Sequence, residues 1–155
     1  MADAATISVT ATMLPDEIAK TISGSMTVTP TDANDKWYYK LTALTTTSAQ
    51  LIAGSFVNYT ALAPATGMTA ITTSDKVRFL FVQNVGATDG IYLCFDGQTA
   101  VNSGVDNVFI GPDQTWFGQL PNTVVGNLSA ISSDIADTGD ASVSAIVIAL
   151  LDDVA

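Results

Sequence analysis

The chain lacks histidine altogether and contains a single cysteine, Cys94. Histidine is the commonest general base and the usual zinc ligand, so its absence removes a Ser-His-Asp arrangement and the usual zinc site. One cysteine cannot form a disulfide within the chain. Cys94 stands in the apolar run 91–95, where we interpret it as a small buried hydrophobe. Phosphate-binding glycine motifs are also missing. We therefore expect no enzymatic activity, no cofactor and no metal.

Basic residues are scarce, with five Lys and Arg against fifteen Asp and Glu and a net charge of −10. So few cations cannot line a groove that follows phosphates, which sets nucleic-acid binding aside. Charged residues make up only 13% of the chain and hydrophobic residues 48%. A surface poor in charge is easily desolvated, so this composition favours lasting contact with other protein subunits.

Long hydrophobic runs are absent as well. The longest, 145–151, is far shorter than the roughly 20 residues that span a bilayer. The first residues, Met-Ala-Asp-Ala-Ala, have neither the basic nor the apolar region of a secretory signal. We expect a soluble protein that is made in a cytoplasm and has no membrane partner.

Strand patterns dominate what is present. Nearly all acids are Asp, which prefers turns, and Glu17 is the only Glu. Alternating segments recur after residue 35, which predicts an all-β fold, a jelly-roll-like β-sandwich. Both faces of 76–82 are apolar, so this strand should be central. Segment 90–95 is predicted to be its hairpin partner, and 142–151 a strand paired within a sheet.

The first 34 residues differ from the rest because they are rich in Thr, Ser and Ala. Their large apolar residues are too sparse for a core of their own. We therefore predict an extended N-terminal arm over 1–34 and a β-sandwich domain over 35–155. We expect this arm to pack on the domain or on a neighbouring subunit, through Ile7, Val9, Met13, Leu14, Ile18, Ile22, Met26 and Val28.

Adjacent aromatic residues are the second candidate contact. Trp37 and Tyr38 follow one another, as do Trp116 and Phe117, so each pair must point to both faces of a strand. One interpretation is a core on both faces. Another is a contact between subunits, where aromatic side chains concentrate. A sugar-binding platform is the third.

The aspartates can be interpreted either as structural residues of turns or as functional residues. Asp75, Asp89, Asp96, Asp106 and Asp113 fall at predicted strand ends, where turn and cap roles are usual. Paired aspartates can instead hydrolyse a glycosidic bond. A further acidic group has a spacing that does not match a calcium loop, and comprises Asp134, Asp137 and Asp140.

Several segments resemble small virion proteins of tailed bacteriophages, in particular capsid decoration, or cement, proteins. They are 14–18 (LPDEI), 27–30 (TVTP), 36–42 (KWYYKLT), 76–84 (KVRFLFVQN), 91–96 (IYLCFD), 110–117 (IGPDQTWF), 120–122 (LPN) and 145–153 (AIVIALLDD). The resemblance covers most of the chain, and none of the segments is a catalytic signature.

The resemblance implies a jelly-roll homotrimer on the capsid exterior that stabilises the shell by bridging subunits of the major capsid protein. It also implies an N-terminal arm that reaches neighbouring subunits, and synthesis in the host cytoplasm. The alternative is a tail- or fibre-associated virion protein with a carbohydrate-binding jelly roll. That function would need an exposed aromatic patch beside Asp or Asn.

Overall fold

A computed structural model describes residues 4–13, 20–32, 35–54, 70–101, 107–133 and 142–152. Within these ranges the regular elements are strands, apart from one short 3-10 turn. They are β1 (Ala5–Met13), β2 (Lys20–Val28), β3 (Lys36–Leu44), β4 (Ala49–Gln50), β5 (Lys76–Asn84), β6 (Ile91–Cys94), β7 (Val108–Ile110), β8 (Thr115–Val124), η1 (Val125–Asn127), β9 (Ser129–Ser132) and β10 (Val143–Asp152). No helix in the described ranges has the length and apolarity needed to cross a membrane.

The chain divides into two compact units, residues 1–33 and 34–155. The first unit is a two-stranded antiparallel ribbon of β1 and β2, which pair from Ala5 with Val28 to Met13 with Lys20. The two alternating segments expected in an extended arm therefore hydrogen-bond to each other.

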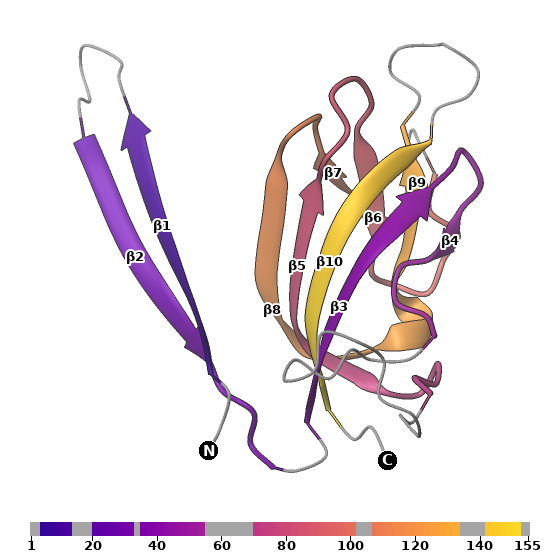
Figure 1. Cartoon of the computed structure of the whole chain (residues 1–155), viewed down its shortest axis with the longest axis horizontal. Coiled ribbons are helices and arrows are strands. Elements are labelled where there is room, and N and C mark those ends of the chain that lie inside the picture. The colour runs from indigo at the N-terminus through magenta and orange to yellow at the C-terminus, as the bar shows by residue number, and fades with distance from the viewer. Residues whose placement is uncertain are drawn as a thin grey trace. The chain divides into compact units, whose positions relative to one another are not determined.

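The second unit is a β-sandwich. Its described strands form two four-stranded sheets, ordered β3-β10-β5-β8 and β4-β9-β6-β7. Figure 1 shows β10 between β3 and β5 in the first sheet, with the second sheet behind it. Two antiparallel four-stranded sheets connected by crossovers are the arrangement of a jelly roll. The predicted all-β, jelly-roll-like class is confirmed.

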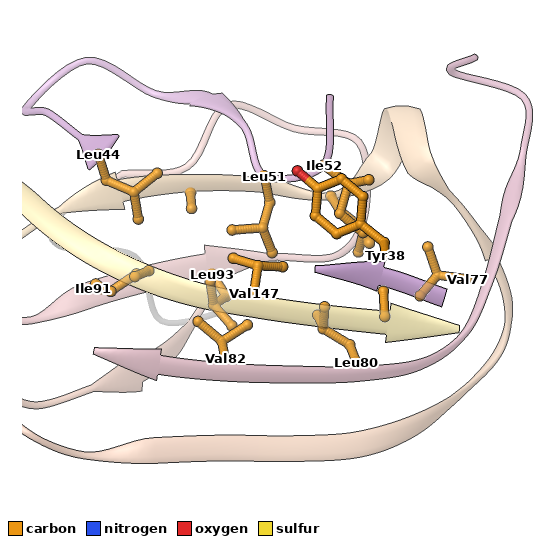
Figure 2. Close-up of a cluster of buried hydrophobic side chains, with 14 of the residues drawn as sticks. Tyr38, Leu44, Leu51, Ile52, Val77, Leu80, Val82, Ile91, Leu93 and Val147 are labelled. Carbon is orange, nitrogen blue, oxygen red and sulfur yellow. The ribbon is translucent and has the colours of Figure 1, made fainter. Parts of the chain in front are cut away.

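Apolar side chains from both sheets fill the space between them. Leu80, Val82 and Val147 of the first sheet face Ile91 and Leu93 of the second (Figure 2), and each is at most 1% exposed. Burial of a Val, Leu or Ile side chain stabilises a fold by about 1.5–3 kcal/mol. This core holds the two sheets together and fixes which side of each strand points outward.

The predicted central position of β5 is confirmed, because β10 and β8 flank it. The predicted hairpin of β5 with 90–95 is wrong. Strand β6 instead pairs with β7 and β9 in the opposite sheet. The connection between β5 and β6 thus crosses from one sheet to the other, as a jelly roll requires.

A buried amide joins the two sheets at this crossover. Asn84 Nδ2 donates hydrogen bonds to the carbonyl oxygens of Asp89 at 2.8 Å and Gly111 at 3.0 Å. Asn84 Oδ1 accepts one from the backbone N–H of Gly86 at 2.8 Å. Asn84 is fully buried, and the two bonds that it donates satisfy buried carbonyl oxygens, while the bond that it accepts is partly buried.

Candidate functional site

The first candidate surface is the outer side of the β3-β10-β5-β8 sheet. Residues opposite one another in paired strands share a face, and the register forms two rows that face away from the core. One row is Tyr39, Ile148, Phe81 and Phe117, and the next begins with Leu41 and Ile146. We call these apolar side chains, which are Tyr39, Leu41, Phe81, Phe117, Ile146 and Ile148, the outer face.

Solvent reaches the outer face. Leu41 is 59% exposed and Tyr39 49%, while the remaining members are partly buried. The two rows hold no charged residue; the first ends in Phe117 and the second in Gln83 and Thr115. In a chain with net charge −10, a sheet face without charge is a surface on which a protein partner is desolvated at little cost.

A buried end adjoins the outer face. Trp37, Leu150 and Phe79 lie in one row across β3, β10 and β5. The rings of Trp37 and Phe79 meet edge to face with centroids 6.4 Å apart. Phe79 and Leu150 are at most 2% exposed, so this row is a buried border at one end of the outer face.

Two of the predicted contact residues, Tyr38 and Trp116, lie on the inner sides of their strands, toward the core. Tyr38 is fully buried between the sheets, and burial raises the pKa of its phenol above the ordinary value. Trp116 packs against the same core and against Phe95, with ring centroids 5.2 Å apart. Alternation along each strand turns Tyr38 and Trp116 inward, which places their neighbours Tyr39 and Phe117 on the outer face.

The second candidate surface is one side of the ribbon. Ile7 lies opposite Met26, Val9 opposite Gly24, and Ala11 opposite Ile22. These pairs and the pair of Ala5 with Val28 share one side. We call its apolar side chains, which are Ala5, Ile7, Val9, Ala11, Ile22, Met26 and Val28, the ribbon face. Ile22 is 55% exposed and Val9 41%, whereas Val28 is only 7% exposed, so the exposed part of the ribbon face lies around Val9 and Ile22.

The other side of the ribbon contains only hydroxyl residues. Thr6 pairs with Thr27, their hydroxyls 3.4 Å apart, and Ser8 pairs with Ser25. The remaining pairs are Thr10 with Ser23 and Thr12 with Thr21. The ribbon is thus amphipathic. A two-stranded hairpin is marginally stable at best in water. Burial of its apolar side against another protein surface would stabilise the ribbon.

The other predicted arm contacts fall at the edge of what the structure describes. Met13 ends β1. Leu14 and Ile18 lie outside the described residues, as do Asp106, Asp134, Asp137 and Asp140.

The outer face was largely missed as a site at the sequence level. Period-two alternation does place Trp37, Tyr39 and Leu41 on one side of a strand, and this signal was available. In β10, however, Ile146, Val147 and Ile148 are all apolar. The sequence therefore does not distinguish the side that faces the core from the side that faces outward.

A shallow hollow of about 250 Å³ lies beside β4 and β9. Its lining is polar and includes Ser48, Gln50, Thr73, Gln98 and Thr99, with no aromatic and no charged side chain among the residues that form it. It lacks the aromatic platform and acidic group expected of a carbohydrate site.

Three of the described aspartates, Asp75, Asp96 and Asp113, have local roles in turns. Asp75 accepts hydrogen bonds from the N–H of Thr72 at 2.8 Å and from its hydroxyl at 2.7 Å. The thiol of Cys94 donates to Asp96 Oδ1 at 2.8 Å, and this bond is the main cause of the lowered pKa of Asp96. Asp113 occupies a turn with φ of 56°. Within the described ranges, no group of three or more acidic or cysteine residues is placed to hold a metal ion.

Comparison with known proteins gives one structural likeness. No protein-family model matches the chain, and no curated protein matches it. The coat protein of Tobacco streak virus matches with a TM-score of 0.40 and 9% sequence identity, covering 78% of this chain and 88% of the coat protein. A likeness at that TM-score and identity establishes neither a common fold family nor a common function.

Proposed function

We propose that this chain is a non-enzymatic structural protein of a tailed bacteriophage. It binds the outside of the capsid as a homotrimer and bridges subunits of the major capsid protein, which stabilises the shell. The observation that carries this proposal is the presence of two uncharged apolar surfaces, the outer face and the ribbon face, on a chain of only 155 residues. The resemblance of its sequence to decoration proteins supports it.

Surfaces of this kind suit a protein that works by attachment. A shell offers the same contact many times, so modest contacts made by several linked copies add up to strong binding. Apolar contacts also tolerate the salt changes that weaken exposed ion pairs. The polar hollow beside β4 and β9 gives the carbohydrate-binding alternative no specific support.

Binding to empty shells tests the proposal. Shells stripped of this protein would be incubated with the full chain and collected by sedimentation, with fully decorated shells as the matched control. We expect saturable binding to the stripped shells and little uptake by the decorated ones. Equal uptake by both, or none by either, would contradict the proposal.

A variant lacking residues 2–28 addresses the ribbon in the same assay. We expect weaker binding to stripped shells from this variant, with the sandwich still folded. Circular dichroism of the sandwich supplies the folding control. Undiminished binding would remove the ribbon from any part in attachment.

A further inference from the structure

We propose that the ribbon face of one copy docks on the outer face of a second copy. The occupant of the outer face is thus the β1–β2 ribbon of another molecule of this chain. This inference deepens the proposed function by naming the contact that links copies. Its test uses no shells, so its failure and the failure of shell binding are told apart.

The side chains of the two surfaces are complementary in kind. The ribbon face carries aliphatic residues such as Ile7, Val9 and Ile22, and the outer face carries aromatic and aliphatic residues such as Tyr39 and Leu41. Aromatic rings with aliphatic neighbours pack densely and bury large areas. The polar Ser and Thr side of the ribbon would then remain in water, which its hydroxyl residues favour.

The dimensions also agree. Strands β1 and β2 have nine residues each, which corresponds to a ribbon about 30 Å long. Strands β3, β5 and β10 have nine or ten residues, so the sheet has nearly the same length, and the two rows of the outer face lie in its middle part. Side by side, two strands cover a width of about 10 Å, and four cover about 19 Å. The ribbon therefore fits along the sheet without extending past it.

The negative charge of the protein limits which surfaces of two copies can meet. Two copies with a net charge of −10 each repel one another, so a stable contact between them must avoid acidic side chains. The paired rows of the outer face contain none, and neither do the ribbon pairs from Ala5 with Val28 to Ala11 with Ile22. Docking these two faces brings no like charges together.

The small area that one ribbon covers favours a closed ring of copies, in which each copy docks its ribbon on the next. One ribbon covers about 300 Å² in projection, which is less than the roughly 800 Å² that each partner contributes to a standard interface. A copy that both gives and receives a ribbon has two such contacts. Exchange of an identical element between copies is a low-cost route to an oligomer, and head-to-tail contacts close into rings such as trimers.

Two substitutions, each with a neighbouring control, test the contact. Val9→Asp places a charge on the ribbon face, and Thr10→Asp places one on the polar side of the same strand. Leu41→Asp places a charge on the outer face, and Thr46→Asp places one at an exposed position outside it. Mass would be measured by light scattering over about a hundredfold range of concentration.

We expect the unchanged protein and both controls to form oligomers, and the Val9→Asp and Leu41→Asp variants to associate at least tenfold more weakly, because a buried unpaired charge is strongly disfavoured. Unchanged thermal unfolding of Leu41→Asp would show that its sandwich is intact. A monomeric unchanged protein, or undiminished association of either face variant, would overturn the inference.

Mixing the two face variants separates contact between copies from contact within one. The Val9→Asp variant retains an intact outer face, and the Leu41→Asp variant retains an intact ribbon. One good contact can therefore form between the two different molecules. We expect a mixed dimer in the mixture that neither variant forms alone. Because the mixed dimer has a single contact, the mixture is measured at the highest concentration of the range, and a mixture that associates there no more than either variant alone would refute docking between copies.

Discussion

Leu41 of β3 lies directly opposite Ile146 of β10 on the outer face, whereas the next residue along β10, Val147, is completely buried between the sheets. Adjacent residues of one strand thus have opposite roles. At these positions the inner side of the sheet stabilises the fold, and the outer side is in contact with solvent.

This relationship predicts unequal effects on stability. Leu41→Ser should change the free energy of unfolding by less than about 0.5 kcal/mol, because the side chain is mostly in water. Val147→Ala should lower it by about 2 kcal/mol, because it removes buried methyl groups and leaves a cavity. Urea denaturation at a concentration where the protein is monomeric measures both values, because association would add to the stability of an oligomer. A loss at Leu41 as large as that at Val147 would show that the outer face is part of the core.

Asn84 should be hard to replace. Asn84→Leu leaves the carbonyl oxygens of Asp89 and Gly111 and the N–H of Gly86 without their partner. Each unsatisfied buried group costs about 1–3 kcal/mol, so we expect a loss of at least about 3 kcal/mol in chemical denaturation. Gln83→Ala, at the partly exposed neighbouring position, is the control and should change little. Similar values for the two variants would argue against the role given to the amide.

The ion pair of Arg78 with Asp35 should contribute to the stability of the fold, because one of its two side chains is buried. Arg78 Nη1 lies 3.0 Å from Asp35 Oδ2, and the Asp35 side chain is fully buried while that of Arg78 is 31% exposed. Arg78→Met should cost about 3 kcal/mol, because it leaves the buried carboxylate without this cation. Adding Asp35→Leu should recover part of the loss. A double variant whose loss equals the sum of the two single losses would show that the pair is not coupled.

Tyr38 predicts sensitivity to alkali. Burial raises the pKa of its phenol above the ordinary value of 10.0, so the folded protein holds this proton more tightly than the unfolded chain does. The resulting stability is fully present below about pH 10 and is lost as the pH rises through the folded pKa. Denaturation midpoints at about pH 9 and about pH 11.5 measure the loss. Tyr38→Phe should lose less stability between these two values, and an equal loss would assign the effect to other groups.

The all-β class follows from local chemistry. Alternation of apolar and polar residues, turn-forming aspartates and the absence of a helical period act over a few residues, so they are visible in the sequence. The central place of β5 could be predicted from its two apolar sides. The partner of β5 could not, because proximity in sequence suggested β6, while the jelly roll pairs β5 with β10, which lies far along the chain.

The candidate surfaces could be predicted only in part from the sequence, because long-range packing also decides which side of a strand is exposed. In the ribbon, small polar and apolar residues alternate strictly, so Ile7, Val9 and Ile22 could be selected from the sequence. In the sandwich, both sides of several strands are apolar, and packing between sheets decides which side is covered. In β3 this packing places Tyr38 inward and Tyr39 outward, although the two side chains are chemically identical.

A protein that bridges capsid subunits should make the shell harder to open by heat. Stripped shells would be heated with and without the added full chain, and release of their contents would be followed against temperature, with already decorated shells as the reference. We expect added protein to raise the release temperature to that of decorated shells. Full binding with no change in the release temperature would contradict this expectation.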